Sequence, residues 1–471
     1  MNKKNNLYAC QYVVTVDCNS YCEYCSFWRN DPEIEREISI EEHKKIVDNL
    51  YSAGVKYLDF TGGEPLLKEW LPELMKYAKD LGFFVTTTTN GILFPKYSNS
   101  LLNCCDEINF SLESTDSSIH NKIRGVKSFD LVKESLKIAQ ELGFKYKIIC
   151  TSNNNYKNIV DLIAFAQKEK TKIYISPVFS YFDNEGESPE SANLIMELLF
   201  EPYVFINLPI YQMIISRKEE EQYLPGCPAL NKTIVISPYG TIYAPCHQHV
   251  AKEIKIDQSL KTLIDTNEFK NIRSEVNNFD FCKECLVNFH FSFSFSSKFN
   301  KFFFMEAIST GKNELEAKIG IDGLIIYKQQ INKSYKKILE LVSTSKTYKD
   351  NYKEIINVDE AEENLINNYL KTSNEFWNLA LHPQYFLHNY FWKILDNGVP
   401  DEIKNQGFLF IIYLWILFIN KYLKTEKRIE ENELKEYSNF LLEYYNKISK
   451  FIPDGFNDEL KEYLQNLNKS K

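Results

Sequence analysis

The chain reads Asp17-Cys18-Asn19-Ser20-Tyr21-Cys22-Glu23-Tyr24-Cys25 shortly after its start. The three cysteines in this stretch follow the spacing Cys-x3-Cys-x2-Cys. Three thiolates this close together can bind three irons of a cubane 4Fe–4S cluster and leave the fourth iron without a protein ligand. A metal position left open by the protein is a place where a small molecule reacts. A structural zinc site is the alternative, but such a site takes four ligands.

Further motifs follow the cysteines in order, and together with them they resemble the radical S-adenosylmethionine (radical SAM) superfamily. Residues 60–67 read Phe-Thr-Gly-Gly-Glu-Pro-Leu-Leu, which is similar to the family's Gly-Gly-Glu-Pro element. Residues 88–91 (Thr-Thr-Asn-Gly) and 111–113 (Ser-Leu-Glu) each end an apolar run. Residues 120–125 (His-Asn-Lys-Ile-Arg-Gly) resemble a further stretch that is common in these enzymes. The resemblance extends over residues 7–178.

The resemblance implies a cofactor site built from these motifs. Cys18, Cys22 and Cys25 would bind the 4Fe–4S cluster, whose open iron S-adenosylmethionine would chelate through its amino nitrogen and carboxylate. Gly62, Gly63 and Glu64 would contact the methionine amine, and Pro65 would stiffen their turn. Asn90, Ser111 and Glu113 would form hydrogen bonds to the ribose or to the methionyl end. Arg124 would pair with the carboxylate, and Tyr24 would lie against the adenine.

The first half of the sequence alternates between strand and helix patterns. Apolar and β-branched runs predict six strands, at residues 12–16, 55–60, 83–89, 107–112, 144–150 and 172–178. Repeated strand–helix units imply an α/β fold with a parallel sheet. Six units fall short of a closed eight-unit barrel, and the resemblance implies a partial (β/α)6 TIM-like barrel. Each motif follows a predicted strand, and active sites of such folds form at the carboxyl ends of the strands.

A second set of cysteines lies further along the chain, at Cys227, Cys246, Cys282 and Cys285. Residues 233–243 between the first two read as two alternating strands around a Ser-Pro-Tyr-Gly turn, which predicts a β-hairpin. This pattern resembles the family's auxiliary-cluster modules, called SPASM or, in a shorter form, twitch, in which a glycine such as Gly240 lies between the first two cysteines.

No cysteine follows Cys285. The resemblance therefore implies one auxiliary 4Fe–4S cluster, of the twitch-like kind, held by the four cysteines. A zinc ion on the same four residues remains the alternative. His247, His249 and His290 are further candidate ligands, although a histidine near cysteines more often supports a metal site than ligates the metal.

The rest of the chain carries no pattern that we recognise as a family. Phe289, Phe291, Phe293 and Phe295 alternate with polar residues, which predicts a strand with an aromatic face. Residues 313–471 are charged and poor in glycine, which predicts helices. The twelve apolar residues 408–419 fall short of the ~20 that span a bilayer, so a buried helix is expected. The predicted domains are a barrel core at 1–220, an auxiliary module at 221–300 and a helical region at 301–471.

Composition sets limits on the function. A chain of 471 residues predicts two or three domains. The net charge of −9 and the lack of a long basic run argue against nucleic acid as a partner. The first residues show no signal peptide, so the 11 cysteines are interpreted as cytoplasmic thiols and cluster ligands rather than disulfides.

The resemblance implies an enzyme that cleaves S-adenosylmethionine to a 5′-deoxyadenosyl radical and removes hydrogen from a peptide or small-molecule substrate. An auxiliary cluster implies oxidation or crosslinking, because it accepts the electron left on the product radical. A flavodoxin or ferredoxin would be the reductant. One alternative is a redox-neutral or adenosyl-transferring enzyme on a lipid-like substrate, suggested by the phenylalanines and the apolar stretch, with limited membrane contact. Another is a catalytically inactive iron–sulfur binding or regulatory protein.

Overall fold

The structure is a computed structural model, and its atoms divide into two compact units, residues 1–294 and 295–471. It describes residues 7–25, 27–29, 36–152, 154–179, 186–216, 226–282, 285–294, 301–344, 399–404, 406–422, 426–452, 458, 461–462 and 464–465. The predicted boundaries at 220 and 300 lie outside the described residues. The predicted division of the first unit into a core and a module stays a prediction.

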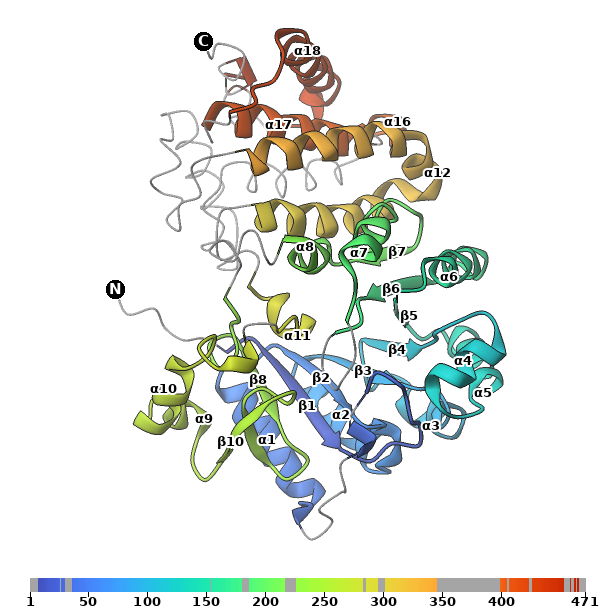
Figure 1. Cartoon of the computed structure of the whole chain (residues 1–471), viewed down its shortest axis with the longest axis vertical. Helices are drawn as coiled ribbons and strands as arrows, with labels where there is room; N and C mark the ends of the chain where they lie inside the picture. Colours follow the sequence, from blue (N-terminus) through green and yellow to red (C-terminus); the bar gives the residue numbers. More distant parts are fainter. Residues whose placement is uncertain are drawn as a thin grey trace. The chain divides into compact units, whose positions relative to one another are not determined.

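A parallel sheet forms the centre of the first unit (Figure 1). Seven strands run parallel in sequence order: β1 (Ala9–Thr15), β2 (Tyr57–Gly62), β3 (Phe84–Thr89), β4 (Glu107–Ser111), β5 (Tyr146–Thr151), β6 (Lys172–Ser176) and β7 (Val204–Ile206). The predicted α/β class and the six predicted strands are confirmed. The short strand β7 adds a seventh that the sequence pattern did not predict.

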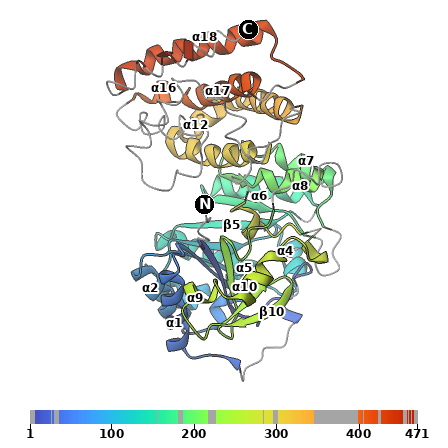
Figure 2. The same ribbon diagram turned by 90° about the vertical axis from the view of Figure 1, so that its left-hand side faces the viewer.

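Helices follow the strands and pack against one face of the sheet (Figure 2). They are α1 (Ile40–Ser52), α2 (Leu71–Asp80), α3 (Phe94–Leu101), α4 (Ser117–Arg124), α5 (Phe129–Glu141), α6 (Tyr156–Lys168), α7 (Pro189–Met196) and α8 (Leu208–Ser216). Helix α1 begins with a capping box, in which Ser39 and Glu42 each accept from the other's backbone N–H. Two orphan donors of the first turn are thereby satisfied.

The two faces of the sheet differ in their burial. Side chains that point toward the helices, such as Leu58, Phe60 and Phe110, are fully buried, and Phe110 packs edge-on against Phe94 of α3. Neighbouring residues that point to the other, inner face, such as Asp59 and Thr61, stay half-buried. Because strand side chains alternate in direction, this pattern shows that solvent reaches the inner face.

The predicted β-hairpin is confirmed next to β1. Strand β8 (Thr233–Ile236) pairs parallel with β1 and antiparallel with β9 (Thr241–Pro245), and β10 (Val250–Lys255) pairs with β9. Gly240 ends the hairpin turn with a φ of 74°, in the left-handed region that favours glycine. The hairpin thus continues the barrel sheet instead of forming a sheet of its own.

The prediction of an aromatic strand at Phe289–Phe295 was wrong. The segment begins as helix α11 (Asn288–Phe291) and continues as a turn, while Phe295 lies outside the described residues. The ring centroids of Phe289 and Phe293 lie 5.7 Å apart. A contact between residues four apart is typical of a helical turn. Phenylalanines at every second position are compatible with both the period of a strand and that of a helix, and tertiary packing selected the helix. Short helices α9 (Leu260–Leu263) and α10 (Asn267–Ser274) precede it.

The second unit is helical in its described part, as predicted. Its helices are α12 (Lys301–Ser343), α16 (Asp401–Lys404), α17 (Gly407–Tyr422) and α18 (Glu431–Ile448). The side chains of residues 409–417 are buried, and Tyr413 packs against Tyr437 of α18 at 4.5 Å. The apolar stretch is therefore a buried helix. Among the described residues, no helix has both the length and the apolar character to cross a membrane.

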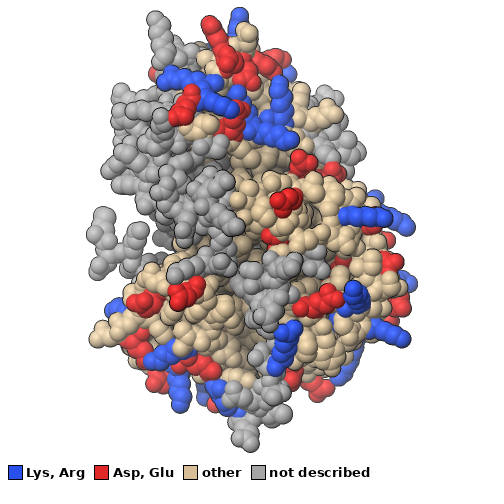
Figure 3. Space-filling model, viewed as in Figure 1, with Lys and Arg blue, Asp and Glu red and all other residues tan. Residues whose placement is uncertain are grey.

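Charged side chains of both signs are interspersed over the face drawn in Figure 3. Many of them form ion pairs at the surface of the first unit, for example Lys44 with Glu73 at 2.7 Å and Lys79 with Asp106 at 2.6 Å. Exposed pairs of this kind contribute little stability individually.

Candidate functional site

The first three cysteines lie on one loop directly after β1. The thiols of Cys18, Cys22 and Cys25 are close enough for each charge to influence the others electrostatically. Burial raises the pKa of Cys18 to about 11 and that of Cys22 to about 12. Buried thiols of this kind become thiolates only beside a strong positive charge, such as that of a bound metal.

The loop also places backbone N–H groups near the sulfurs. The backbone N–H groups of Ser20 and Phe27 lie close enough to the Cys18 and Cys25 sulfurs, respectively, to oppose the effect of burial on the pKa of these thiols. The indole N–H of Trp28 donates to the Cys22 carbonyl at 3.2 Å. Hydrogen bonds to thiolates are among the features that tune iron–sulfur clusters, so the three residues fit the cluster that the resemblance implies.

The two glycines after β2 lie directly against this loop. The N–H of Gly63 donates to the Thr15 carbonyl at 2.8 Å, and the N–H of Glu64 donates to the Asp17 carbonyl at 2.7 Å. A Cβ on Gly62 would lie 2.2 Å from the Thr15 oxygen, and a Cβ on Gly63 would lie 1.8 Å from the Asp17 oxygen. Glycine is therefore required at both positions so that the chain can pack against the Thr15 and Asp17 backbone. This requirement is independent of any contact with a cofactor.

Replacing Gly63 by alanine is expected to destabilise the first unit and to reduce iron binding, because backbone atoms cannot move aside as a flexible side chain can. Overpacking costs of about 3 kcal/mol correspond to a fall of roughly 6–12 °C in the thermal midpoint. Gly143→Ala is the matched control, since its added Cβ meets nothing within 4 Å and it carries only a positive φ. Equal midpoints for the two variants, measured anaerobically, would contradict this reading.

Glu64 joins the end of β2 to the end of β3. Its carboxylate accepts from the Thr89 hydroxyl at 2.7 Å and from the Asn90 backbone N–H at 2.7 Å, and also from the Leu66 N–H. The side chain is buried, and burial raises its pKa. Both carboxylate oxygens are occupied by the protein, so Glu64 acts as a positioning residue in this structure, while Pro65 begins the following 3-10 turn.

Asn90 connects β3 to the cysteine loop. Its side-chain amide donates to the Asn19 side chain at 2.6 Å and to the Ser20 hydroxyl at 3.1 Å. The end of α4 makes a third connection, because Tyr21 N–H donates to the Arg124 carbonyl at 2.9 Å. Gly125 is required there, since a Cβ would lie 2.5 Å from the Tyr21 oxygen. The motifs thus converge on the loop that carries the cysteines.

Tyr24, Glu113 and Arg124 form one buried group beneath the cysteines. The Tyr24 hydroxyl donates to the Glu113 carboxylate, and the Arg124 guanidinium lies 3.2 Å from the same oxygen. The other Glu113 oxygen accepts from Thr151 N–H at 3.0 Å. The charges of Tyr24, Cys22 and Glu113 raise the pKa of Arg124, opposing the effect of its burial, so it stays a cation beside the thiols.

Two residues that the sequence reasoning missed hold this group in place. His120 accepts from the Glu113 N–H at 3.2 Å through Nδ1, which puts its proton on Nε2, 3.0 Å from the Ser128 hydroxyl. Burial lowers the His120 pKa to about 4, so the ring is neutral at pH 7. Asn158 donates to the Glu113 carbonyl. By contrast, the hydroxyl of Ser111, at the end of β4, makes no side-chain hydrogen bond to any residue the structure describes.

The second cysteine set also comes together in the first unit. The thiols of Cys227, Cys246, Cys282 and Cys285 influence one another electrostatically. Burial raises the pKa of Cys246 to about 11 and raises that of Cys227 and Cys282 as well. Like the first set, they suit a positively charged metal group.

Backbone N–H groups lie near each sulfur of the second set. Val287 N–H donates to the Cys285 sulfur at 3.5 Å. For the other sulfurs, nearby backbone N–H groups oppose the effect of burial on the thiol pKa: Ala229 for Cys227, His249 and Gln248 for Cys246, and Asn277 and Phe279 for Cys282. Asn277, which the sequence did not single out, also clamps the Cys227 peptide group with bonds of 2.6 and 3.3 Å. Such backbone donors accompany both iron–sulfur and zinc sites, so they do not separate the two.

An aromatic contact joins the two cysteine sets. Phe27, two residues after Cys25, stacks on His247, which follows Cys246, with ring centroids 5.6 Å apart. His249 stacks instead on Phe281 at 4.4 Å, and Nδ1 of His290 lies 2.7 Å from the Thr233 hydroxyl. These contacts give the three histidines supporting positions around the second set.

Two further observations complete the description of the site. Within the described ranges, no three His, Cys, Asp or Glu side chains are arranged to hold a single metal ion.

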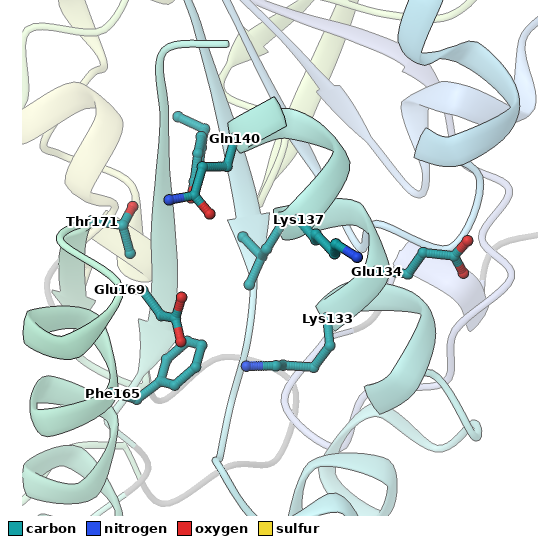
Figure 4. Close-up of a pocket in the computed structure, with 9 residues that line it drawn as sticks. Lys133, Glu134, Lys137, Gln140, Phe165, Glu169 and Thr171 are labelled. Carbon is teal, nitrogen blue, oxygen red and sulfur yellow. The ribbon is translucent and has the colours of Figure 1, made fainter. Parts of the chain in front are cut away.

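A crevice of about 420 Å³ lies between α5 and α6, where the Lys133 ammonium lies 3.6 Å from the centre of the Phe165 ring (Figure 4). None of its lining residues belongs to the motifs above, so the crevice is separate from the candidate site.

Comparison with known proteins agrees with this site. Residues 12–166 match the radical SAM superfamily. The chain is 33% identical over 161 residues to the Fe-coproporphyrin III synthase of Methanosarcina barkeri, covering 33% of this chain and 40% of that protein. It is 28% identical over 248 residues to the antilisterial bacteriocin subtilosin biosynthesis protein AlbA of Bacillus subtilis, covering 50% and 54%.

The chain spans about half the length of these two relatives. Among solved structures, Streptococcus suis SuiB bound to S-adenosylmethionine aligns with a TM-score of 0.48 at 19% identity, over 60% of this chain and 70% of that one.

Proposed function

We propose that this radical SAM superfamily protein binds a 4Fe–4S cluster through Cys18, Cys22 and Cys25 and uses it with S-adenosylmethionine to oxidise or crosslink a peptide or small-molecule substrate. When bound, such a cluster supplies the electron that splits S-adenosylmethionine into methionine and a 5′-deoxyadenosyl radical. That radical removes a hydrogen atom from an unactivated carbon. The protein's own residues position these partners and keep water away.

The observation that carries the proposal is the anchoring of the cysteine loop by three separate motifs, two at strand ends and one at the end of α4. Gly63 and Glu64 bond to its start, Asn90 to its middle and Arg124 to its Tyr21. Active sites of parallel α/β folds form at this edge of the sheet. A loop held from three sides keeps the thiols in place while one iron position stays open to a ligand.

The remaining motif residues would serve S-adenosylmethionine at the same edge. Ser111 offers a hydroxyl that no described residue occupies, which suits a bond to the ribose or methionyl end. Arg124 carries a positive charge that suits the carboxylate of S-adenosylmethionine, and it would bind that carboxylate while it stays paired with Glu113. Tyr24 presents its ring near Cys22 while its hydroxyl is bonded to Glu113, which suits a ring lying against the adenine.

For the second set we propose a 4Fe–4S cluster on Cys227, Cys246, Cys282 and Cys285. The mutual approach of four thiols, two buried and two half-buried, and the backbone N–H groups near them support a metal group here. Such a cluster accepts an electron, which favours an oxidative outcome. A flavodoxin or ferredoxin would supply electrons to the first cluster, in the cytoplasm.

The alternatives have less support. The lipid-like substrate was suggested by the apolar stretch, whose side chains at 409–417 are buried in the second unit. An inactive binding protein would not need the anchored loop and the open iron. The names of the relatives, an Fe-coproporphyrin III synthase and a bacteriocin biosynthesis protein, leave both small molecules and peptides as substrate classes.

The proposal is tested by incubating the anaerobically reconstituted protein with S-adenosylmethionine and a strong reductant, without substrate. Slow formation of 5′-deoxyadenosine is the expected result, measured by liquid chromatography and mass spectrometry. An omission of the reductant serves as the control. A fully reconstituted protein that forms no 5′-deoxyadenosine in the presence of reductant would contradict the proposed function.

A further inference from the structure

The inner face of the sheet carries polar side chains deep below the strand ends. In β2 and β3, the inner positions are Tyr57, Asp59, Thr86 and Thr88, and register places Gln11 of β1 beside Asp59 and Asn109 of β4 beside Thr88. Strands buried on both faces in parallel sheets are usually apolar throughout. Here the helix-facing positions are apolar or fully buried, while the inner positions are polar: Thr86 and Asn109 are buried, and the other four are half-buried.

These neighbouring side chains, which make hydrogen bonds in two groups, we call the polar layer: Gln11, Tyr57, Asp59, Thr86, Thr88 and Asn109. Thr86 donates to Asp59 at 2.7 Å, so the Tyr57 hydroxyl must donate to Thr86, 2.9 Å away. The Gln11 side chain lies close enough to Asp59 to lower its pKa. Asn109 donates to Thr88 at 3.1 Å.

The polar layer leaves acceptors without donors. Oε1 of Gln11 and Oδ1 of Asn109 are buried and have no hydrogen-bond partner, and Asn109 as a whole is 5% exposed. Asp59 is an acceptor-only group when ionised. A buried acceptor without a partner costs about 1–3 kcal/mol, so these two oxygens favour a bound group that donates hydrogen bonds. Water can supply a donor, but it brings no positive charge for the Asp59 carboxylate.

Electrostatics favour a cationic donor. Lys147 of β5 lies opposite Asn109 in the register, and its charge lowers the pKa of Asp59. The same ammonium is paired with Glu107 at 2.6 Å, so one cation is shared by two carboxylates. Burial raises the pKa of Asp59 to about 6, which leaves it mostly ionised at pH 7. The Tyr57 ring, stacked on Phe84 at 5.8 Å, adds an aromatic surface next to it, and such surfaces attract cations.

We infer that the polar layer binds a primary ammonium group of the substrate, as in a lysine side chain or another amine on a short aliphatic stem. Asp59 lies three residues before Gly62, which places it about 10 Å below the strand end. With the ammonium beside Asp59, a carbon at the opposite end of the stem would lie close to the strand ends where the cysteine loop is anchored. This inference rests on the proposed function and narrows its substrate class.

The test compares two probes that differ in the ammonium alone: N-acetyl-lysine N-methylamide and N-acetyl-norleucine N-methylamide. Their binding to the full chain is measured by titration calorimetry or ligand-observed NMR. We expect the lysine probe to bind at least about tenfold more tightly, since hydrogen bonds to charged groups reach this size. Asp59→Asn should reduce the ratio to near one, and Asn109→Leu should weaken the lysine probe several-fold.

Asp161→Asn is the matched control, because it makes the same chemical change on the exposed face of α6. It should leave both probes unaffected. If circular dichroism shows that Asp59→Asn does not fold, the binding of the lysine probe to Asn109→Leu is the deciding measurement. Equal binding of the two probes to the wild type, or an unchanged ratio in folded Asp59→Asn, overturns the inference.

The two proposals fail separately. Probe binding needs no turnover, so a wild type that forms no 5′-deoxyadenosine contradicts the proposed function alone. A wild type that forms 5′-deoxyadenosine but does not prefer the lysine probe contradicts the ammonium site alone.

Discussion

Replacing Cys22 by alanine is expected to abolish the formation of 5′-deoxyadenosine from S-adenosylmethionine. Cys22 lies between the other two cysteines of the loop and is the most buried of the three. Without it, only two thiolates remain, and a cubane with two protein ligands is not expected to persist. The measurement is the yield of 5′-deoxyadenosine per protein under a strong reductant. Undiminished cleavage by this variant would contradict the assignment of the cluster.

Iron content gives a second measure of the same site. The reconstituted wild type is expected to bind about eight irons, four in each cluster. Changing Cys18, Cys22 and Cys25 together to alanine should leave about four. Cys105→Ala is the control, since Cys105 follows α3 outside both sets and should keep all the iron. A triple variant that retains about eight irons would show that the loop holds no cluster.

Much of this site could be predicted because its residues are close in sequence and follow strands. Strand period and propensity predicted where β1 to β6 end, and the carboxyl ends of parallel strands meet at one edge. That reasoning brought the cysteine loop, Gly62, Asn90 and Glu113 together before any coordinates. The hairpin at β8 and β9 was predictable for the same reason, because its turn residues are local.

Contacts between distant elements could not be predicted in this way. Nothing in the sequence says that Arg124 pairs with Glu113, or that the glycine pair faces the backbone of Thr15 and Asp17. Such facts depend on register and curvature, which no local pattern encodes. Asn277 was missed because a single asparagine between helices carries no motif. The alternating phenylalanines after Cys285 fitted two periods, and packing decided between them.

The polar layer was overlooked for a different reason. Thr86 and Thr88 were interpreted as β-branched residues that favour a strand, which is correct but incomplete. Their neighbours across the sheet, Asp59 and Asn109, come from other strands, and only the register places them side by side. A polar inner face is therefore a property of the assembled sheet rather than of any one strand.

The second large effect is expected at the other cysteine set. Changing Cys282 and Cys285 together to alanine should leave the formation of 5′-deoxyadenosine intact while abolishing the finished product. The proposed S-adenosylmethionine site uses no residue of 227–285, so the proposed second cluster would have no part in binding S-adenosylmethionine. When bound, an auxiliary cluster supplies an acceptor for the electron that an oxidised or crosslinked product must lose.

The product can be followed without knowing the substrate in advance. Small molecules and peptides are compared by mass spectrometry between cells that carry the wild type, no copy, or the double variant. A product that is present with the wild type and absent without any copy should also be absent with the double variant. The purified variant should lose about four irons and still cleave S-adenosylmethionine. Asn271→Ala, on exposed α10 between the cysteines of this set, is the control.

The double variant must first be shown to fold, because loss of a metal can unfold the segment that binds it. The segment has support of its own here: β8 pairs with β1, and Val235 packs with Val13, Tyr243 and Phe27. We therefore expect the circular dichroism spectrum to be retained. If the folded variant forms the product at the wild-type rate, the second metal group is structural, and a redox-neutral reaction replaces the oxidative one. If the wild type instead binds zinc at these four cysteines, the second metal group is also structural, because zinc cannot accept an electron.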